Sequence, residues 1–203
     1  MKYLRPASAL LLLFLIGTGV VFPLFITFVA NFAFPYQAHG SLLKLDGKIV
    51  GSELIGQNFT DPKYFHPRPS ANNYDAENSG GTNLGPTNPQ LLVGAKDFDG
   101  IQQLAALYRK ENGLSADTII PADAVTRSGS GLDPNISVRN ALLQAKRVAA
   151  TRGLPLSAVT SLIGRSTVQK FLGIYGGKYV NVLDLNLAID KLDGHEGSKT
   201  QEH

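Results

Sequence analysis

Residues 7–34 read ASALLLLFLIGTGVVFPLFITFVANFAF, and this stretch decides how the chain is organised. It contains no charged side chain, and the run without Asp, Glu, Lys or Arg extends over residues 6–43. At ~1.5 Å rise per residue, a helix over residues 7–30 would be about 36 Å long, whereas the hydrocarbon core of a bilayer is about 30 Å thick. The stretch therefore predicts one transmembrane helix within residues 7–34.

The short segment before this stretch indicates its orientation. Lys2 and Arg5 are its only charges. A cleaved secretory signal also begins with positive charges, but its apolar region is usually about 7 to 15 residues long and is followed by an A-x-A-like site. Here the apolar region is longer and no such site follows, so we expect a retained anchor. The positive-inside rule then places residues 1–6 in the cytoplasm and residues 35–193 outside, in the periplasm or extracytoplasmic space of a bacterium.

Three residues of the predicted helix are candidates for transmembrane packing. Gly17 and Gly19 could let a second helix approach closely, although simple tolerance of glycine is an equal alternative. Pro23 removes one backbone hydrogen bond, which membrane helices tolerate.

The composition excludes several classes of protein. Charged residues make up 17% of the chain, less than the usual share of about 25% in soluble proteins. The 19 basic and 16 acidic residues give a formal charge of +3, so nothing indicates the basic face that nucleic acids require. The chain has no cysteine, which excludes disulfides and thiolate metal sites, and its four histidines are scattered. We expect neither nucleic-acid binding nor a metal site.

The region after the anchor has the patterns of one domain. Asp46-Gly47 lies between two short alternating runs and predicts a tight hairpin at residues 43–50. Apolar spacing predicts a first helix over residues 88–112 that ends at Gly113. A second helix should begin after Ser137 as its amino cap and end at Gly153.

The remaining elements are shorter. Ser157 is expected to cap a third helix that ends near Gly164. Alternation over residues 179–189 predicts a late strand that passes into a helix, and residues 194–203 form a polar tail that we expect to be frayed. Together the patterns predict an α+β or α/β domain with three main helices, a hairpin and a late strand behind one transmembrane helix.

A long loop separates the hairpin from the first helix. Residues 57–90 are rich in Pro, Gly and Asn but contain four aromatic residues, which favours an ordered binding loop over disorder. Arg68 stands between Pro67 and Pro69 in this loop, on a backbone with little freedom. Two interpretations stay open: an interface anchor, or a loop arginine paired with a nearby carboxylate, Asp61, Asp75 or Glu77.

Two glycine-rich stretches could suggest catalytic chemistry. SGGTNLGP at residues 79–86 matches neither the P-loop nor the dinucleotide fingerprint. SGSGLDP at residues 128–134 lacks the nucleophile elbow and is explained as a helix-entry loop. An anchored periplasmic hydrolase that uses Ser130 and His66 remains the alternative from another functional class. Gln144 and Arg147, which share a helix face, are most simply explained as a solvated surface.

Six blocks follow the apolar stretch in order. They are GSELIGQNF (51–59), YFHPRPS (64–70), SGGTNLGP (79–86), SGSGLDPNIS (128–137), QAKRVAATRGL (144–154) and VNVLDLNLAI (180–189). Behind a single anchor, they resemble the C subunit family (KdpC) of the bacterial Kdp complex, an ATP-driven high-affinity potassium importer. The resemblance extends from the anchor to about residue 189.

The resemblance implies a non-catalytic subunit. Its partners would be a channel-like subunit that binds potassium and a P-type ATPase subunit, and it would act as a catalytic chaperone that raises ATP affinity. Gln144 matches a glutamine proposed in the family to contact nucleotide, but a domain outside the membrane cannot reach cytoplasmic ATP. We therefore expect a scaffold that binds no cofactor directly and meets ATP and K⁺ only through the complex. The partner-interface candidates are Tyr64, Phe65, Arg68, Ser70, Asn83 and Asp133.

Overall fold

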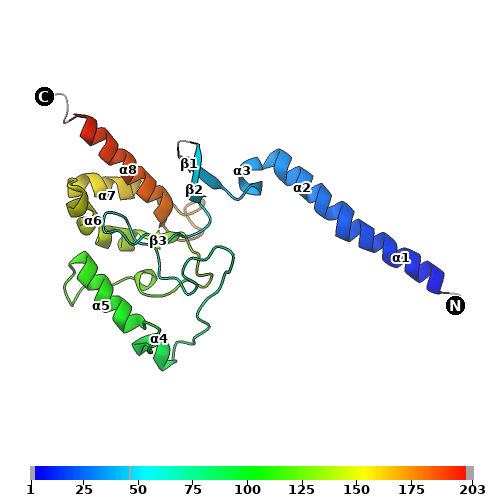
Figure 1. Ribbon diagram of the computed structural model, residues 1–203, viewed down its shortest axis with the longest axis horizontal. Helices are drawn as coiled ribbons and strands as arrows, with labels where there is room; N and C mark the ends of the chain where they lie inside the picture. Colours follow the sequence, from blue (N-terminus) through cyan, green and yellow to red (C-terminus); the bar gives the residue numbers. More distant parts are fainter. Residues whose placement is uncertain (1–2, 46, 200–203) are drawn as a thin grey trace. The chain divides into compact units, whose positions relative to one another are not determined.

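The computed structural model describes residues 3–45 and 47–199, with side chains up to Leu192 (Figure 1). The chain divides into two compact units, Met1–Ser52 and Glu53–His203. The first holds the apolar stretch and the hairpin, and the second holds the remaining helices and a three-stranded sheet. This is the expected α+β architecture behind one apolar amino-terminal helix.

The apolar stretch forms a continuous helix over Leu4–Ala33, which is long and apolar enough to cross a membrane. It consists of α1 (Leu4–Ile16), a π-helical turn (Gly17–Val21) and α2 (Phe22–Ala33). In the wide turn, the Phe22 backbone N–H donates to Gly17 O, five residues back. Pro23 has no N–H for the carbonyl four residues before it, which explains why the wide turn lies next to the proline. The expected apolar helix is confirmed as a candidate membrane span, and it starts three residues earlier than expected.

The hairpin follows a short helix, α3 (Pro35–Ala38). Strands β1 (Leu42–Leu45) and β2 (Lys48–Ser52) pair in antiparallel fashion, with a register shift between Leu43 and Lys44. The predicted hairpin is therefore confirmed, although Asp46 of its turn lies outside the described residues. The Ser52 hydroxyl donates to Gly40 O at 2.7 Å and ties the end of β2 to the chain before β1.

The second unit combines helices with a small antiparallel sheet in the strand order β3-β5-β4. Its strands pair through short registers, such as Ile136 with Val180. In chain order the elements are α4 (Pro89–Val93), α5 (Ile101–Asn112), the 3₁₀ turn η2 (Ala122–Ala124), β3 (Asn135–Ser137), α6 (Val138–Arg152), α7 (Leu156–Arg165), β4 (Thr167–Val168), β5 (Tyr179–Asn181) and α8 (Val182–Lys199).

The expected boundaries of the second helix are confirmed, whereas two other helix expectations are wrong. The Ser137 hydroxyl accepts from Asn140 N at 3.1 Å as the amino cap of α6, and Gly153 ends that helix in the left-handed region. The helix expected over residues 88–112 is divided, because Gly94 adopts φ 83° and the chain turns before α5 begins. The third helix follows Pro155, so Ser157 lies inside its first turn and is not its cap.

The late strand is shorter than expected. It ends at Asn181, whose side-chain oxygen accepts from Leu183 N at 3.0 Å and from Asp184 N at 3.2 Å. These bonds satisfy free N–H groups at the start of α8, which is the role of an amino cap. The helix then continues to Lys199, so the polar tail expected to be frayed is helical in its first part. Residues 200–203 lie outside the described chain.

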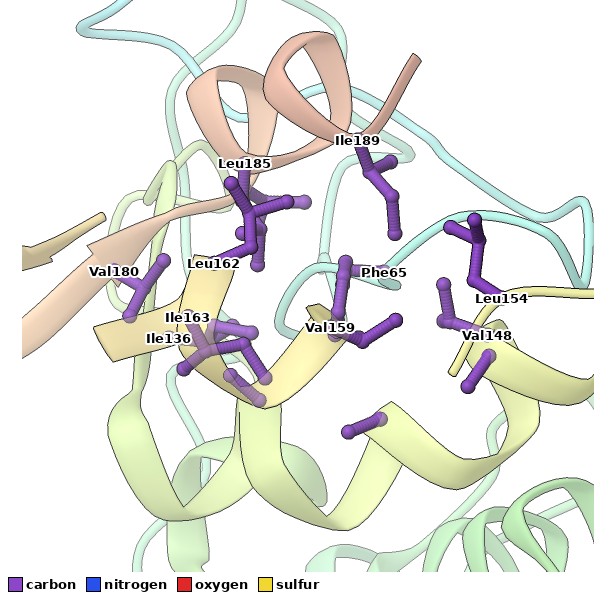
Figure 2. Packing of buried hydrophobic residues seen from close by; sticks show 14 residues of the cluster. Phe65, Ile136, Val148, Leu154, Val159, Leu162, Ile163, Val180, Leu185 and Ile189 are labelled. Carbon is purple, nitrogen blue, oxygen red and sulfur yellow. The ribbon is translucent and has the colours of Figure 1, made fainter. Parts of the chain in front are cut away.

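The main core lies between α6, α7, α8 and the sheet (Figure 2). Phe65, from the long loop, is fully buried in it. A core aromatic supplied by an otherwise irregular segment confirms that this part of the loop is ordered. The other fully buried large apolar side chains of this core are Ile136, Val148, Val159, Ile163, Val180, Leu185 and Ile189.

Candidate partner interface

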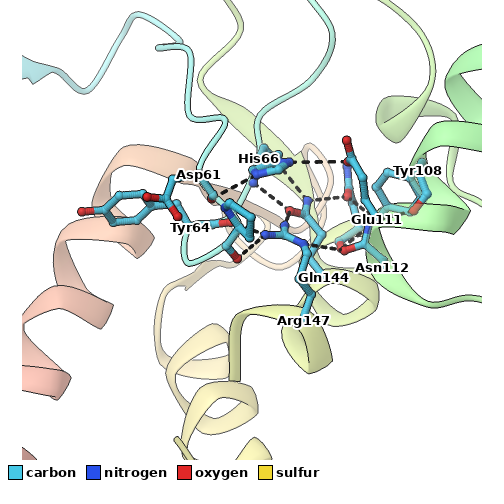
Figure 3. A network of polar contacts seen from close by, with 10 residues as sticks. Asp61, Tyr64, His66, Tyr108, Glu111, Asn112, Gln144 and Arg147 are labelled. Carbon is cyan, nitrogen blue, oxygen red and sulfur yellow. Dashed lines mark hydrogen bonds and ion pairs between the residues drawn. The ribbon is translucent and has the colours of Figure 1, made fainter. Parts of the chain in front are cut away.

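Two buried side-chain amides hold consecutive residues of the YFHPRPS segment. Asn186 of α8 accepts from Phe65 N at 2.8 Å and donates to Phe65 O at 3.0 Å. Gln144 of α6 does the same for His66, accepting from its N–H at 2.7 Å and donating to its carbonyl at 3.1 Å (Figure 3). Each amide thus supplies the donor and acceptor that a neighbouring strand would give. The segment is fixed without belonging to a sheet.

Arg147 extends this network to the first part of the loop (Figure 3). Its guanidinium donates to Tyr64 O at 2.9 Å, to the carbonyl of Pro62, and to Gln144 Oε1 at 2.8 Å. Its Nε donates to Asn112 Oδ1 at 3.0 Å, at the end of α5. Burial lowers the pKa of Arg147, but the guanidinium remains charged because it is a very weak acid. One half-buried cation therefore joins the loop, α5 and α6.

A second arginine holds Tyr64 at the edge of the segment. Arg152 donates to Lys63 O at 2.7 Å and to Asp190 Oδ1 at 2.7 Å. Its guanidinium carbon lies 4.9 Å from the centre of the Tyr64 ring, and the Tyr64 hydroxyl donates to Asp190 at 3.2 Å. The aromatic side chain is positioned by stacking and by its hydroxyl.

The YFHPRPS segment (residues 64–70) and the SGSGLDP segment (residues 128–134) are bonded to each other, and we call them the paired loops. Arg68 forms an ion pair with Asp133 at 2.8 Å. The Ser70 hydroxyl donates to Gly131 O at 2.7 Å, and Ser128 N donates to Pro69 O at 3.2 Å. The two candidate contact segments therefore form one surface.

Glycines make the close approach of these loops possible. Gly131 has φ 71°, and a Cβ there would clash with Asn72 Oδ1 and lie 2.8 Å from the backbone oxygen of Gly80. A Cβ on Gly81 would lie 2.8 Å from Gly129 O, which places SGGTNLGP against the same loop. The Gly80 N–H also donates to Ser130 O at 2.8 Å. The glycine-rich stretches thus serve loop packing, in agreement with the absence of phosphate-loop motifs.

A hollow of about 210 Å³ lies beside the paired loops. His66 forms part of its wall, with Nδ1 3.7 Å from Glu111 and Nε2 3.2 Å from Asp61 O. Burial and the nearby Arg147 charge lower the pKa of His66, against the opposite effect of Glu111. The imidazole is therefore neutral near pH 7. Other lining residues include Phe59, Pro69, Tyr74, Leu104, Leu107 and Tyr108.

A family model described as "K+-transporting ATPase, c chain" matches residues 4–191. The chain belongs to this family, KdpC. A protein named "Potassium-transporting ATPase KdpC subunit" from Mycobacterium tuberculosis is 51% identical over 193 residues, 94% of this chain and 99% of the relative. Proteins with the same name from Caulobacter vibrioides and Caldanaerobacter subterraneus are 50% and 49% identical, over 94% and 88% of this chain and 93% and 89% of theirs. As a KdpC subunit, the chain is an accessory part of a potassium import complex with other subunits.

Gln144, implicated in nucleotide contact by the resemblance to KdpC, is only 1% exposed. Its oxygen accepts from His66 N and Arg147, and its nitrogen donates to His66 O and to Asn140 Oδ1 at 2.8 Å. These bonds occupy both ends of the amide. The expectation of a solvated helix face at Gln144 and Arg147 is wrong, because both side chains point to the loop rather than to water.

The interface candidates differ in how much surface they offer. Phe65 is fully buried, which corrects its expected place on a contact surface: it holds the segment to the core. Tyr64, Arg68, Ser70 and Asp133 are half-buried and lie on or beside the paired loops, while Asn83 is exposed. Of the two interpretations of Arg68, pairing with a nearby carboxylate of the same loop is wrong in its partner, since the carboxylate is Asp133, 65 residues away.

The structure offers no support for the hydrolase alternative. The Ser130 hydroxyl accepts from Leu132 N at 3.1 Å, while the His66 ring contacts Asp61 and Glu111. No hydrogen bond joins Ser130 to His66 in the described part of the chain. Within the same residues, no group of three His or carboxylate side chains could hold a metal ion.

Asn186 and Arg152 are not among the candidate residues expected from the sequence, and the role of Gln144 and Arg147 in holding the segment is not visible there. Asn186 and Arg152 lie in blocks that carry the resemblance to KdpC, but nothing in their spacing indicates that they bind a loop more than 80 residues away. Asn186 also sits on the same helix face as Leu185 and Ile189, where a polar residue among buried ones is the available signal.

Proposed function

We propose that this subunit is non-catalytic and stabilises the assembly of a channel-like, potassium-binding subunit with a P-type ATPase subunit. The support is the paired loops: a surface that carries aromatic, arginine and carboxylate groups and is held rigid by buried amides. A rigid surface loses little conformational entropy when it binds a partner. In this proposal the other subunits of the complex bind ATP and K⁺, and this chain contributes the contacts that stabilise their assembly.

The proposal includes an orientation. Residues 1–6 are cytoplasmic, the apolar helix spans the inner membrane, and residues 35–193 are periplasmic or extracytoplasmic. Lys2 and Arg5 support it through the positive-inside rule. Protease added to intact spheroplasts should remove the carboxyl-terminal domain; protection until the membrane is permeabilised would reverse the orientation.

In this orientation, a chaperone effect on ATP affinity is indirect. Gln144 supports this interpretation, because its amide is buried and bonded to the segment at His66. We propose that Gln144 acts by keeping the paired loops in shape for contact with the ATPase assembly. Cytoplasmic exposure of residues 35–193 would instead favour direct nucleotide contact.

Copurification tests the assembly role. In the complete complex, Tyr64→Ala combined with Arg68→Ala should reduce recovery of the other subunits and potassium-dependent ATPase activity. Glu77→Ala is the matched control, since Glu77 is exposed in the same long loop and outside the paired loops. A double variant that melts as the parent does and still recovers every subunit would exclude this surface from assembly.

A further inference from the structure

A second surface, distinct from the paired loops, lies between β4 and β5. Four large apolar side chains are strongly exposed there: Phe171 at 71%, Leu172 at 74%, Ile174 at 75% and Tyr175 at 67%. They cluster within five positions, whereas isolated exposed apolar residues are ordinary. We call residues 170–178 the apolar loop.

The apolar loop has a defined shape, so its exposure does not come from lack of structure. Phe171 N donates to Tyr175 O at 2.9 Å, and Tyr175 N donates to Phe171 O at 3.0 Å. Gly173 N also donates to Lys170 O at 3.0 Å. These bonds close a tight turn on which the four side chains extend outward.

Leu172, at the tip of the loop, has a backbone conformation that is unfavourable for leucine. Leu172 has φ 52°, in the left-handed region where glycine or asparagine costs less than a bulky side chain. Its side chain is three-quarters exposed and adds nothing to either core cluster. A strained, exposed leucine is explained by a contact made outside the chain.

The charges around the loop indicate what that contact is. Residues 165–183 include Arg165, Lys170 and Lys178 but no Asp or Glu. Aromatic and aliphatic side chains next to lysines are typical of segments that enter the headgroup region of a bilayer, where the cations meet lipid phosphates. The rest of the chain is close to neutral, so this concentration of positive charge is local.

The chain also keeps its second unit near a bilayer. The apolar helix ends at Ala33 and the second unit begins at Glu53. The residues between them span at most about 65 Å when fully extended. A weak affinity for lipid then suffices, because the tether raises the effective concentration of the surface.

We propose that the apolar loop is a second membrane contact: Phe171, Leu172, Ile174 and Tyr175 enter the interfacial layer of a bilayer, and Lys170 and Lys178 bind anionic phospholipid headgroups. The single helix anchors the chain, and the loop fixes how the second unit meets the lipid surface. This inference is independent of the proposed assembly role of the paired loops.

Depth-dependent quenching in the full chain tests it. Because the chain has no cysteine, Ile174→Cys can carry one environment-sensitive fluorophore, with Ala116→Cys as an exposed control outside the loop. In discs of equal phosphatidylcholine and phosphatidylglycerol, doxyl lipids should quench the label at 174 at least threefold more than at 116. Equal quenching at the two positions would overturn the proposal. So would shielding of position 174 that occurs only when the other subunits are added, since the occupant would then be protein.

Two further variants separate lipid contact from folding. Leu172→Asn should lower quenching at 174 while keeping or raising the melting temperature, because asparagine tolerates positive φ. Lys170→Gln with Lys178→Gln should weaken the preference for anionic lipid roughly fivefold per lysine. A clear loss of melting temperature in Leu172→Asn, or unchanged anionic preference in the lysine variant, would contradict the proposal.

Discussion

Gln144 and His66 exchange two hydrogen bonds: the backbone N–H of His66 donates to Gln144 Oε1 at 2.7 Å, and Gln144 Nε2 donates to the His66 carbonyl at 3.1 Å. A side chain 78 residues away thus takes the place of a neighbouring strand. Asn186 holds the adjacent residue, Phe65, in the same way from another helix. The proposed partner-binding surface depends on these two amides.

Gln144→Leu should destabilise the domain by about 2 to 4 kcal/mol, because it keeps the volume but leaves the buried N–H of His66 and a guanidinium donor without an acceptor. Thermal and urea unfolding of the full chain, followed by circular dichroism, measures this. Lys146→Leu, two positions along α6 and exposed, is the matched control. If Gln144→Leu changed only the ATP affinity of the complex and left stability intact, the proposal that Gln144 holds the segment in place would be refuted.

The two amides should act as a unit. Asn186→Leu alone should cost about as much as Gln144→Leu, and the double variant should cost less than the sum, with a coupling of about 1 kcal/mol. Either change releases the same short segment, so the second change removes fewer remaining interactions and costs less free energy. Strict additivity in a double-mutant cycle would show that Phe65 and His66 are held independently.

Gly131→Ala should destabilise the paired loops, because its Cβ would lie 2.8 Å from the backbone oxygen of Gly80 and its φ of 71° disfavours a side chain. A loss of at least about 1 to 2 kcal/mol is expected, together with weaker association with the other subunits. Gly129→Ala is a close control: no atom lies within 4 Å of its added Cβ and its φ is not in the left-handed region. Equal effects of the two changes would remove the packing argument.

His66 should make the domain less stable in mild acid. Its pKa is lowered from the usual 6.5 by burial and by the Arg147 charge. Between 6.5 and its lower native value, the unfolded chain holds more protons than the folded chain, so the free energy of unfolding falls as pH drops through this window. His66→Gln should make the melting temperature depend less on pH within this window. His39→Gln, which changes an exposed histidine, should leave this pH dependence unchanged. If His66→Gln kept the full pH dependence of stability, another group would be responsible for it.

Much of the fold could be predicted because its signals are local. The Ser137 cap and the Gly153 terminator each depend on residues within one or two helical turns, and the apolar stretch is one continuous run of residues. Two element boundaries were less visible. The apolar spacing of residues 88–112 fits one long helix as well as the two helices separated at Gly94. After Asn181 the spacing fits a strand or a helix, and the hydrogen bonds to the Asn181 side chain start the helix.

The site was predictable only in part. The sequence indicates that YFHPRPS is ordered and that Arg68 is stiffly held, but it cannot show which carboxylate meets that arginine. Asp133, Gln144 and Asn186 reach the segment across 65 to 121 residues. A buried amide that binds a distant backbone has the same local pattern as a polar residue on a helix surface, so the sequence around Gln144 favours a solvent-exposed side chain.

Site-directed photocrosslinking tests the central claim most directly. Ala71, exposed at the end of the YFHPRPS segment, can be changed to cysteine in this cysteine-free chain and given a benzophenone group; Ala116→Cys serves as the exposed control. In the assembled complex, illumination should join position 71 to another subunit and leave position 116 unlinked. If position 71 gave no crosslink while the complex remained intact, the paired loops would not be the surface that holds this potassium-transporting ATPase together.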